Sequence, residues 1–226
     1  MRPKAAVYHL GVSQKRRPFR VVAVVAVLGV VLMGLLAGRH TLLRAAGRML
    51  VIDDPIRAAD AIVIAVDARD AGALEAADLV HSGISRRVAL FADLPDDVDR
   101  ELTRRGIEHG NEVTHLTQLL RTLGVEHVEQ IPRPIAGTED EGRVFPAWCD
   151  EQRFRSVIVV SGADHARRLR RVFRRAMKGH STTVMVRRAR YSEFDPDKWW
   201  WKRGGIRSEI VEVEKLFLDF LRHPVS

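Results

Sequence analysis

The feature that most constrains the fold is a regular alternation of short apolar runs and longer amphipathic stretches, which begins after Asp53. Five runs have the length and β-branched content of strands, at residues 61–66, 88–92, 128–131, 157–160 and 182–186. Five stretches of helical periodicity separate or follow them, at residues 70–81, 96–105, 112–123, 139–152 and 164–178. Such alternation predicts an α/β domain in three layers, with helices on both faces of a mainly parallel sheet of about five strands.

The strand ends are where a functional site is expected. The runs at 61–66 and 157–160 are wholly apolar, which is typical of strands buried on both faces. Ligands of parallel sheets bind beyond the carboxyl ends of the strands. The residues that follow these two runs are therefore the first candidates for a site.

An uncharged run of 18 residues, 21–38, precedes the α/β pattern. As a helix it would be about 27 Å long, close to the hydrocarbon thickness of a bilayer. A buried core helix would contain some polar side chain. A cleaved signal peptide has a shorter apolar part and a better cleavage site. We therefore predict an uncleaved transmembrane helix that anchors the chain in the lipid bilayer.

The basic residues are distributed very unevenly. Nine of the 37 lie in residues 1–48, which hold no acid, so the remaining 28 stand against 29 acidic residues. The net charge of +8 is therefore no sign of a nucleic-acid partner. The positive-inside rule predicts a single-pass protein of the cytoplasmic membrane with its N-terminus in the cytoplasm. The expected parts are a basic N-terminus (1–20), the span (21–38), a connector (39–58) and an extracytoplasmic domain (59–226).

The segment after the fourth predicted strand is the strongest candidate for chemistry. It runs from Ser161 through Asp164 to His165, where a strand gives way to a helix N-terminus. Asp164 is a candidate N-cap, and His165 lies in the first turn. Six arginines cover the following helix; we expect a solvated face, except for Arg167 and Arg168 beside His165.

Two other patterns are weaker. Glu112 and His115 have the spacing of half a carboxylate-bridged metal site, but the second half is missing, and His109 cannot share their helix face. No metal site is predicted. At the C-terminus, three tryptophans (199–201) precede a stripe formed by Ile206, Ile210, Val213, Leu216 or Phe217, and Phe220. We expect this helix to pack on the sheet; a membrane-surface role or a stacking platform for the tryptophans stays open.

The order of motifs resembles the ElyC/SanA/YdcF family of bacterial proteins. Asp60–Asp67 is similar to the family's first strand, and Ala76, Leu79 and Gly83 fit its first helix. Glu112–Val113 and Leu120–Val125 fit the next segment, and Gly137–Gly142 corresponds to an N-T-x-E-N loop. Val160–Arg168 fits the last motif, with His165 on the family histidine. The family's glycine pair is replaced by Ala65 and Val66, and its two asparagines by Gly137 and Gly142, which indicates a divergent member.

The resemblance implies a Rossmann-like domain outside the cytoplasmic membrane that serves cell-envelope upkeep. S-adenosylmethionine binding has been associated with the family, but the cofactor here stays unknown. We predict a cleft around His165, with His165 as general acid/base or hydrogen-bond donor and Glu141 as the residue that orients it. Ligand-binding candidates are Asp67, Glu112, Thr138, Ser161 and Arg168. The expected ligand is an anionic phosphate- or glycan-bearing envelope precursor; a noncatalytic scaffold and a nucleotide binder are the alternatives.

Overall fold

The computed structural model describes residues 16–107 and 110–224. The chain divides into two compact units, with the boundary between Leu42 and Leu43. Helix α1 (Arg16–Leu50) runs through both. The second unit thus begins before residue 59, and the predicted connector supplies part of it. Most of the predicted cytoplasmic N-terminus lies outside the described residues.

The predicted transmembrane helix is not supported as a single span. No one helix in the described part of the chain is both long and apolar enough to cross a membrane. Val21–Gly34 and Leu36–Leu50 meet at an angle of 50° and reach that length and composition only as a pair. Gly34 ends the first segment, and glycine lowers helix stability because its backbone is unusually free.

Five parallel strands form the sheet predicted from the sequence. They are β1 (Ala61–Ile64), β2 (Arg87–Leu90), β3 (His127–Gln130), β4 (Ser156–Ser161) and β5 (Thr183–Arg188). Their spatial order is β3-β2-β1-β4-β5, which is the order of the first five strands of the six-stranded Rossmann fold. Ile64 of β1 pairs with Val160 of β4, so the segments that follow these two strands emerge next to each other.

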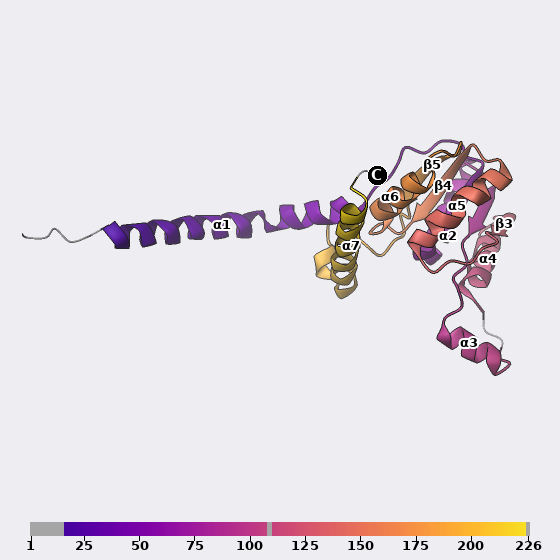
Figure 1. Ribbon diagram of the computed structural model, residues 1–226, viewed down its shortest axis with the longest axis horizontal. Helices are drawn as coiled ribbons and strands as arrows, with labels where there is room; N and C mark the ends of the chain where they lie inside the picture. The colour runs from indigo at the N-terminus through magenta and orange to yellow at the C-terminus, as the bar shows by residue number, and fades with distance from the viewer. Residues whose placement is uncertain (1–15, 108–109, 225–226) are drawn as a thin grey trace, which may run out of the picture. The chain divides into compact units, whose positions relative to one another are not determined.

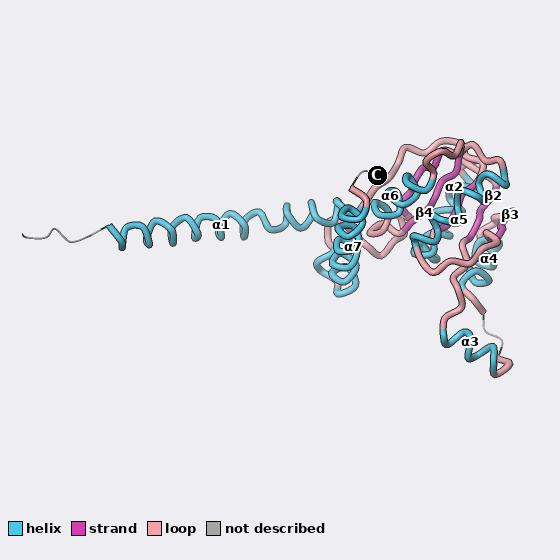
Figure 2. Tube along the Cα trace, viewed as in Figure 1, coloured by secondary structure: helices cyan, strands magenta, loops and turns pink. Residues whose placement is uncertain are grey.

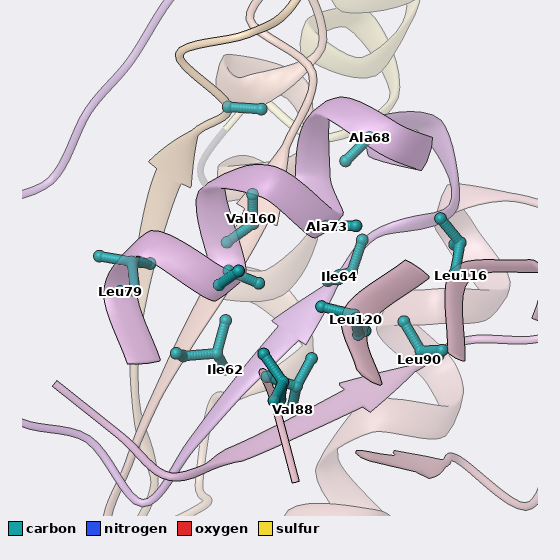
Figure 3. Close-up of a cluster of buried hydrophobic side chains, with 14 of the residues drawn as sticks. Ile62, Ile64, Ala68, Ala73, Leu79, Val88, Leu90, Leu116, Leu120 and Val160 are labelled. Atoms are coloured by element: carbon teal, nitrogen blue, oxygen red, sulfur yellow. The ribbon is translucent and has the colours of Figure 1, made fainter. Parts of the chain in front are cut away.

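Helices cover both faces of this sheet, which confirms the layered α/β prediction (Figures 1 and 2). Helices α2 (Arg69–His81) and α4 (Glu112–Thr122) pack on one face. Helices α5 (Thr138–Gln152) and α6 (Ala166–Ala176) pack on the other. Figure 3 shows the core on the α2 and α4 side, where Leu120 of α4 belongs to the same buried cluster as Ile62 and Val88 of the sheet. A fully buried leucine stabilises the fold by about 1.5–3 kcal/mol.

Helix α3 (Asp97–Arg104) stands apart from these layers (Figure 1). It buries no residue and begins with a capping box between Asp96 and Asp99. The helix therefore depends on local hydrogen bonds rather than on packing against the sheet.

The C-terminal helix α7 (Arg203–Arg222) differs from its predicted packing. It contacts α6 and the short 3-10 helix η2 (Trp199–Trp201), and its apolar stripe does not face the sheet. Within that stripe Leu216 is buried, whereas Ile206, Ile210, Phe217 and Phe220 are exposed. The buried face instead carries three acids, Glu209, Glu212 and Asp219.

Arginines of α6 explain this inverted packing. Arg168 pairs with Glu212, and Arg171 and Arg175 both pair with Asp219, at 2.5–3.0 Å. Arg170 pairs with Asp54, and Arg167 donates to the Met49 carbonyl oxygen. The solvated face was expected for Arg170, Arg171, Arg174 and Arg175, and it is wrong for Arg170, Arg171 and Arg175, because carboxylates from other segments meet them.

Candidate functional site

The site begins at the carboxyl ends of β1 and β4. Asp67 follows β1 in a short 3-10 turn (Val66–Ala68), and its Oδ2 accepts a hydrogen bond of 2.8 Å from the Gly162 amide after β4. The Ser161 hydroxyl donates to the same oxygen at 3.3 Å. A Cβ on residue 162 would lie 2.7 Å from Asp67 Oδ2, so glycine is what permits this approach. A carboxylate of the chain itself therefore accepts the hydrogen bond of a backbone amide at the switch point of the sheet, the place where the strand order reverses.

A second carboxylate occupies the neighbouring amide. Glu141 comes from the first turn of α5, is buried, and accepts a hydrogen bond of 2.9 Å from the Val66 amide. Burial, together with the charge of Asp67, raises the pKa of Glu141 to about 7. Two amides that could have held a phosphate in a nucleotide-binding fold are thus taken by side chains of the chain itself.

His165 lies at the start of α6 and is only 6% exposed. Its Nδ1 is 2.9 Å from Glu212 Oε2, and its Nε2 is 3.0 Å from Thr138 Oγ1. The hydroxyl, imidazole and carboxylate form a continuous chain that joins α5, α6 and α7. This is the arrangement in which a carboxylate fixes the histidine tautomer and the histidine can take a proton from a hydroxyl.

The charges around His165 are tightly coupled. Burial by itself lowers the pKa of His165, but the Asp67 charge and the hydrogen bond to Glu212 outweigh it and raise the pKa. Burial also opposes ionisation of Glu212, yet the bonds from His165 and Lys215 hold its pKa below the ordinary range. Nδ1–H of the ring then donates to Glu212. Arg168 donates from Nε to the same carboxylate at 3.0 Å.

An open pocket of about 700 Å³ lies beside this cluster. Its wall is formed by the loops after β1, β4 and β5 and by the starts of α2, α4 and α7. Five carboxylates line it: Asp67, Asp70, Glu112, Asp164 and Glu193. Arg69 and Lys202 are the basic residues of the wall, and Tyr191 gives it an exposed ring.

Backbone strain is present at the pocket wall. Arg69 has φ 43° and ψ −138°, a backbone conformation that residues other than glycine rarely adopt. Strained residues of this kind are often found at ligand sites, since only the surrounding structure holds them in place. Arg69 links the Asp67 turn to α2, so the strain lies directly beside the switch-point carboxylate.

The seven candidates from the sequence fall into two groups. Asp67 and Glu112 line the pocket. Thr138, Glu141, Ser161, His165 and Arg168 belong to the network behind it and do not line it. Asp67 touches Ser161, and His165 touches Thr138 and Arg168. The charge of Glu141 interacts with those of Asp67 and His165, so these six of the seven form one neighbourhood. Glu112 meets it only across the pocket.

Glu212 is the residue that sequence reasoning missed. It lies 47 positions after His165, on a helix that was predicted to pack through its apolar stripe and not through its acids. The spacing of Glu209, Glu212, Leu216 and Asp219 is that of one helix face. The acids on one face of this helix, together with the six arginines of another, could have indicated that the two helices pair through their charges.

Glu112 and His115 both border the pocket, but His115 is bonded to Asp70 at 2.8 Å. Among the described residues no group of three or more His, Cys, Asp or Glu side chains is placed to hold a metal ion. His109, the third residue of that pattern, lies outside the described part of the chain.

Strand order and site together define a class: an α/β protein with a Rossmann-like sheet and a pocket at its switch point. No family model and no curated protein matches the chain. The solved structure of HcgE from Methanothermobacter marburgensis, bound to guanylylpyridinol and ATP, is 11% identical and covers 77% of this chain and 100% of its own. Its TM-score of 0.27 is too low to carry an argument about fold or ligand.

Proposed function

We propose that this chain is a membrane-anchored protein of the bacterial cell envelope, a divergent relative of the ElyC/SanA/YdcF family, that binds a glycan-bearing envelope precursor. Residues 21–38 anchor it in the cytoplasmic membrane, with the N-terminus in the cytoplasm and the α/β domain outside. The apolar segment, its basic flanks and the motif order support the location. The pocket supports the binding function.

One observation carries the binding proposal: a pocket of about 700 Å³ lies at the carboxyl edge of β1 and β4. This volume fits a ligand of two or three sugar rings rather than an ion. Carboxylates accept hydrogen bonds from sugar hydroxyls, and an exposed ring such as Tyr191 offers an apolar surface to a sugar face.

The charge of the pocket favours the glycan over the phosphate part of the expected precursor. Five carboxylates face two basic side chains on its wall, so a phosphate would meet net repulsion there. Arg168, the residue expected to hold an anion, is engaged by Glu212. The amides of Val66 and Gly162, which suit a phosphate, are occupied by Glu141 and Asp67.

The test compares two probes on the full chain in detergent micelles: N,N′-diacetylchitobiose and inorganic pyrophosphate. Calorimetry should detect the disaccharide and not pyrophosphate. Glu112→Gln should weaken disaccharide binding about 3- to 10-fold, because it replaces a charge-assisted hydrogen bond by a weaker neutral one. Glu126→Gln, an exposed control at the β3 edge, should leave it unchanged. Tighter binding of pyrophosphate would contradict the glycan proposal.

A second candidate is a tethered scaffold without a ligand. The observation that favours it is the complete engagement of His165, which is buried and has a partner on each ring nitrogen. Binding of neither probe to a folded chain would support the scaffold over the glycan binder.

A further inference from the structure

Helix α7 exposes apolar side chains and buries acidic ones. Ile210, Phe217 and Leu221 are 61%, 60% and 64% exposed, and Trp201 of η2 is 70% exposed. Glu209, Glu212 and Asp219 are buried on the opposite side. At 100° per residue, Ile206, Ile210, Phe217 and Leu221 lie within an arc of about 60°. These four residues and Trp201 form what we call the α7 apolar face.

Basic side chains flank this face. Between residues 198 and 222 the exposed charged residues are Lys198, Lys202, Arg203, Arg207, Lys215 and Arg222 against a single acid, Glu214. The other three acids of the segment are turned inward and paired or buried. An apolar stripe with tryptophan at one end and a cationic border is the composition of a helix that lies in a lipid headgroup layer.

The chain places this face close to the end of the apolar segment. The Trp199 indole donates to the Leu43 carbonyl oxygen at 2.8 Å, and Gly47 leaves room for Pro196 and Trp199 against α1. Leu43 is five residues after Gly38, so even an extended chain spans at most about 18 Å between them. If residues 21–38 lie in the membrane, η2 is therefore held at the bilayer surface.

We infer that the α7 apolar face docks on the surface of an anionic bilayer. The inference rests on the proposed membrane anchor and deepens it. Apolar residues enter the headgroup layer, and Lys202, Arg203 and Arg207 meet lipid phosphates. Docking there fixes the domain on the membrane, as a single flexible tether would not.

The experiment uses the full chain in nanodiscs with phosphatidylglycerol, labelled at one introduced cysteine with a polarity-sensitive dye. Cys149 is buried, so labelling at Phe217→Cys is selective. The matched control is Val98→Cys on α3, which is 64% exposed. We expect the label at 217 to shift to the blue, and brominated lipid to quench it at least about twice as strongly as the label at 98.

The second arm of the experiment changes the charge of the protein or of the lipid. Arg203→Gln with Arg207→Gln, or zwitterionic nanodiscs, should reduce the shift at 217, because anionic headgroups attract surface cations. Equal quenching at 217 and 98 in anionic nanodiscs would overturn the inference. So would shielding at 217 that grows with protein concentration in detergent, since a second copy of the chain would then be the occupant.

Failure of the anchor is separable from failure of docking. A chain that does not enter nanodiscs contradicts the anchor. The label at 217 is then measured on the free chain with phosphatidylglycerol vesicles. A blue shift there supports docking without an anchor, and no shift overturns docking as well.

Discussion

Single residues of the network carry consequences that depend on pH. Glu141 has a pKa of about 7 in the folded chain, above the ordinary value of 4.5, because burial and Asp67 both disfavour its charged form. The folded state therefore binds this proton more tightly than the unfolded state. Stability that Glu141 contributes by staying protonated is lost as pH rises from 4.5 through 7.

Glu141→Gln removes that dependence and keeps an oxygen acceptor for the Val66 amide. We expect the free energy of unfolding at pH 8 to rise by roughly 3 kcal/mol at most, the equivalent of a shift of about 2.5 pKa units. At pH 4 the substitution should have little effect. Urea unfolding at both pH values measures it. Glu139→Gln, exposed on the same turn, is the control; an equal gain from both would argue against a buried cause.

Among the elements, the contact between α6 and α7 is held by ion pairs rather than by apolar packing. Asp219 is buried and meets Arg171 at 2.5 Å and Arg175 at 2.7 Å. Removing one member of a buried pair leaves an uncompensated charge. The exposed apolar face of the same helix has no such role in the fold.

Two substitutions on α7 should therefore rank in the reverse of the order that residue type suggests. Replacing the acidic residue should lower stability more than replacing the apolar one. Asp219→Asn should lower the free energy of unfolding by about 3 kcal/mol, since two arginines lose their carboxylate. Ile210→Ser should change it by less than about 0.5 kcal/mol, because the side chain is already exposed. Guanidinium unfolding of the full chain in detergent measures both. A larger loss from Ile210→Ser would mean that the apolar stripe is a packing face after all.

The whole molecule is proposed to sit with its α/β domain outside the cytoplasm. Six basic residues precede the apolar segment and three follow it within residues 39–48, and this excess on the N-terminal side argues for that orientation. Alkaline phosphatase fused after Ser226 should be active, and a fusion of a cytoplasmic reporter at the same place inactive. The chain should stay in the membrane fraction after alkaline carbonate extraction. The reverse pattern of reporters would place the domain in the cytoplasm and contradict the envelope proposal.

The sequence predicted much of this fold because its signals are local. Apolar runs such as 61–66 and 157–160 allow little except buried parallel strands, and the helices between them have clear periods. Ser161 and His165 were found because they lie where one of these predicted strands ends, and ligands of parallel sheets bind at that edge. Asp67 was found through the family resemblance.

Only the tertiary structure decided which charges meet. Glu212 reaches His165 across 47 positions, and Asp67 reaches Gly162 across 95, distances at which local pattern says nothing. The predicted orientation of α7 was wrong for the same reason. Its apolar stripe resembles a buried face, but its acids face inward because they pair with the arginines of α6. Local periodicity determined that a helix forms, and the charges it met after folding determined which side faces inward.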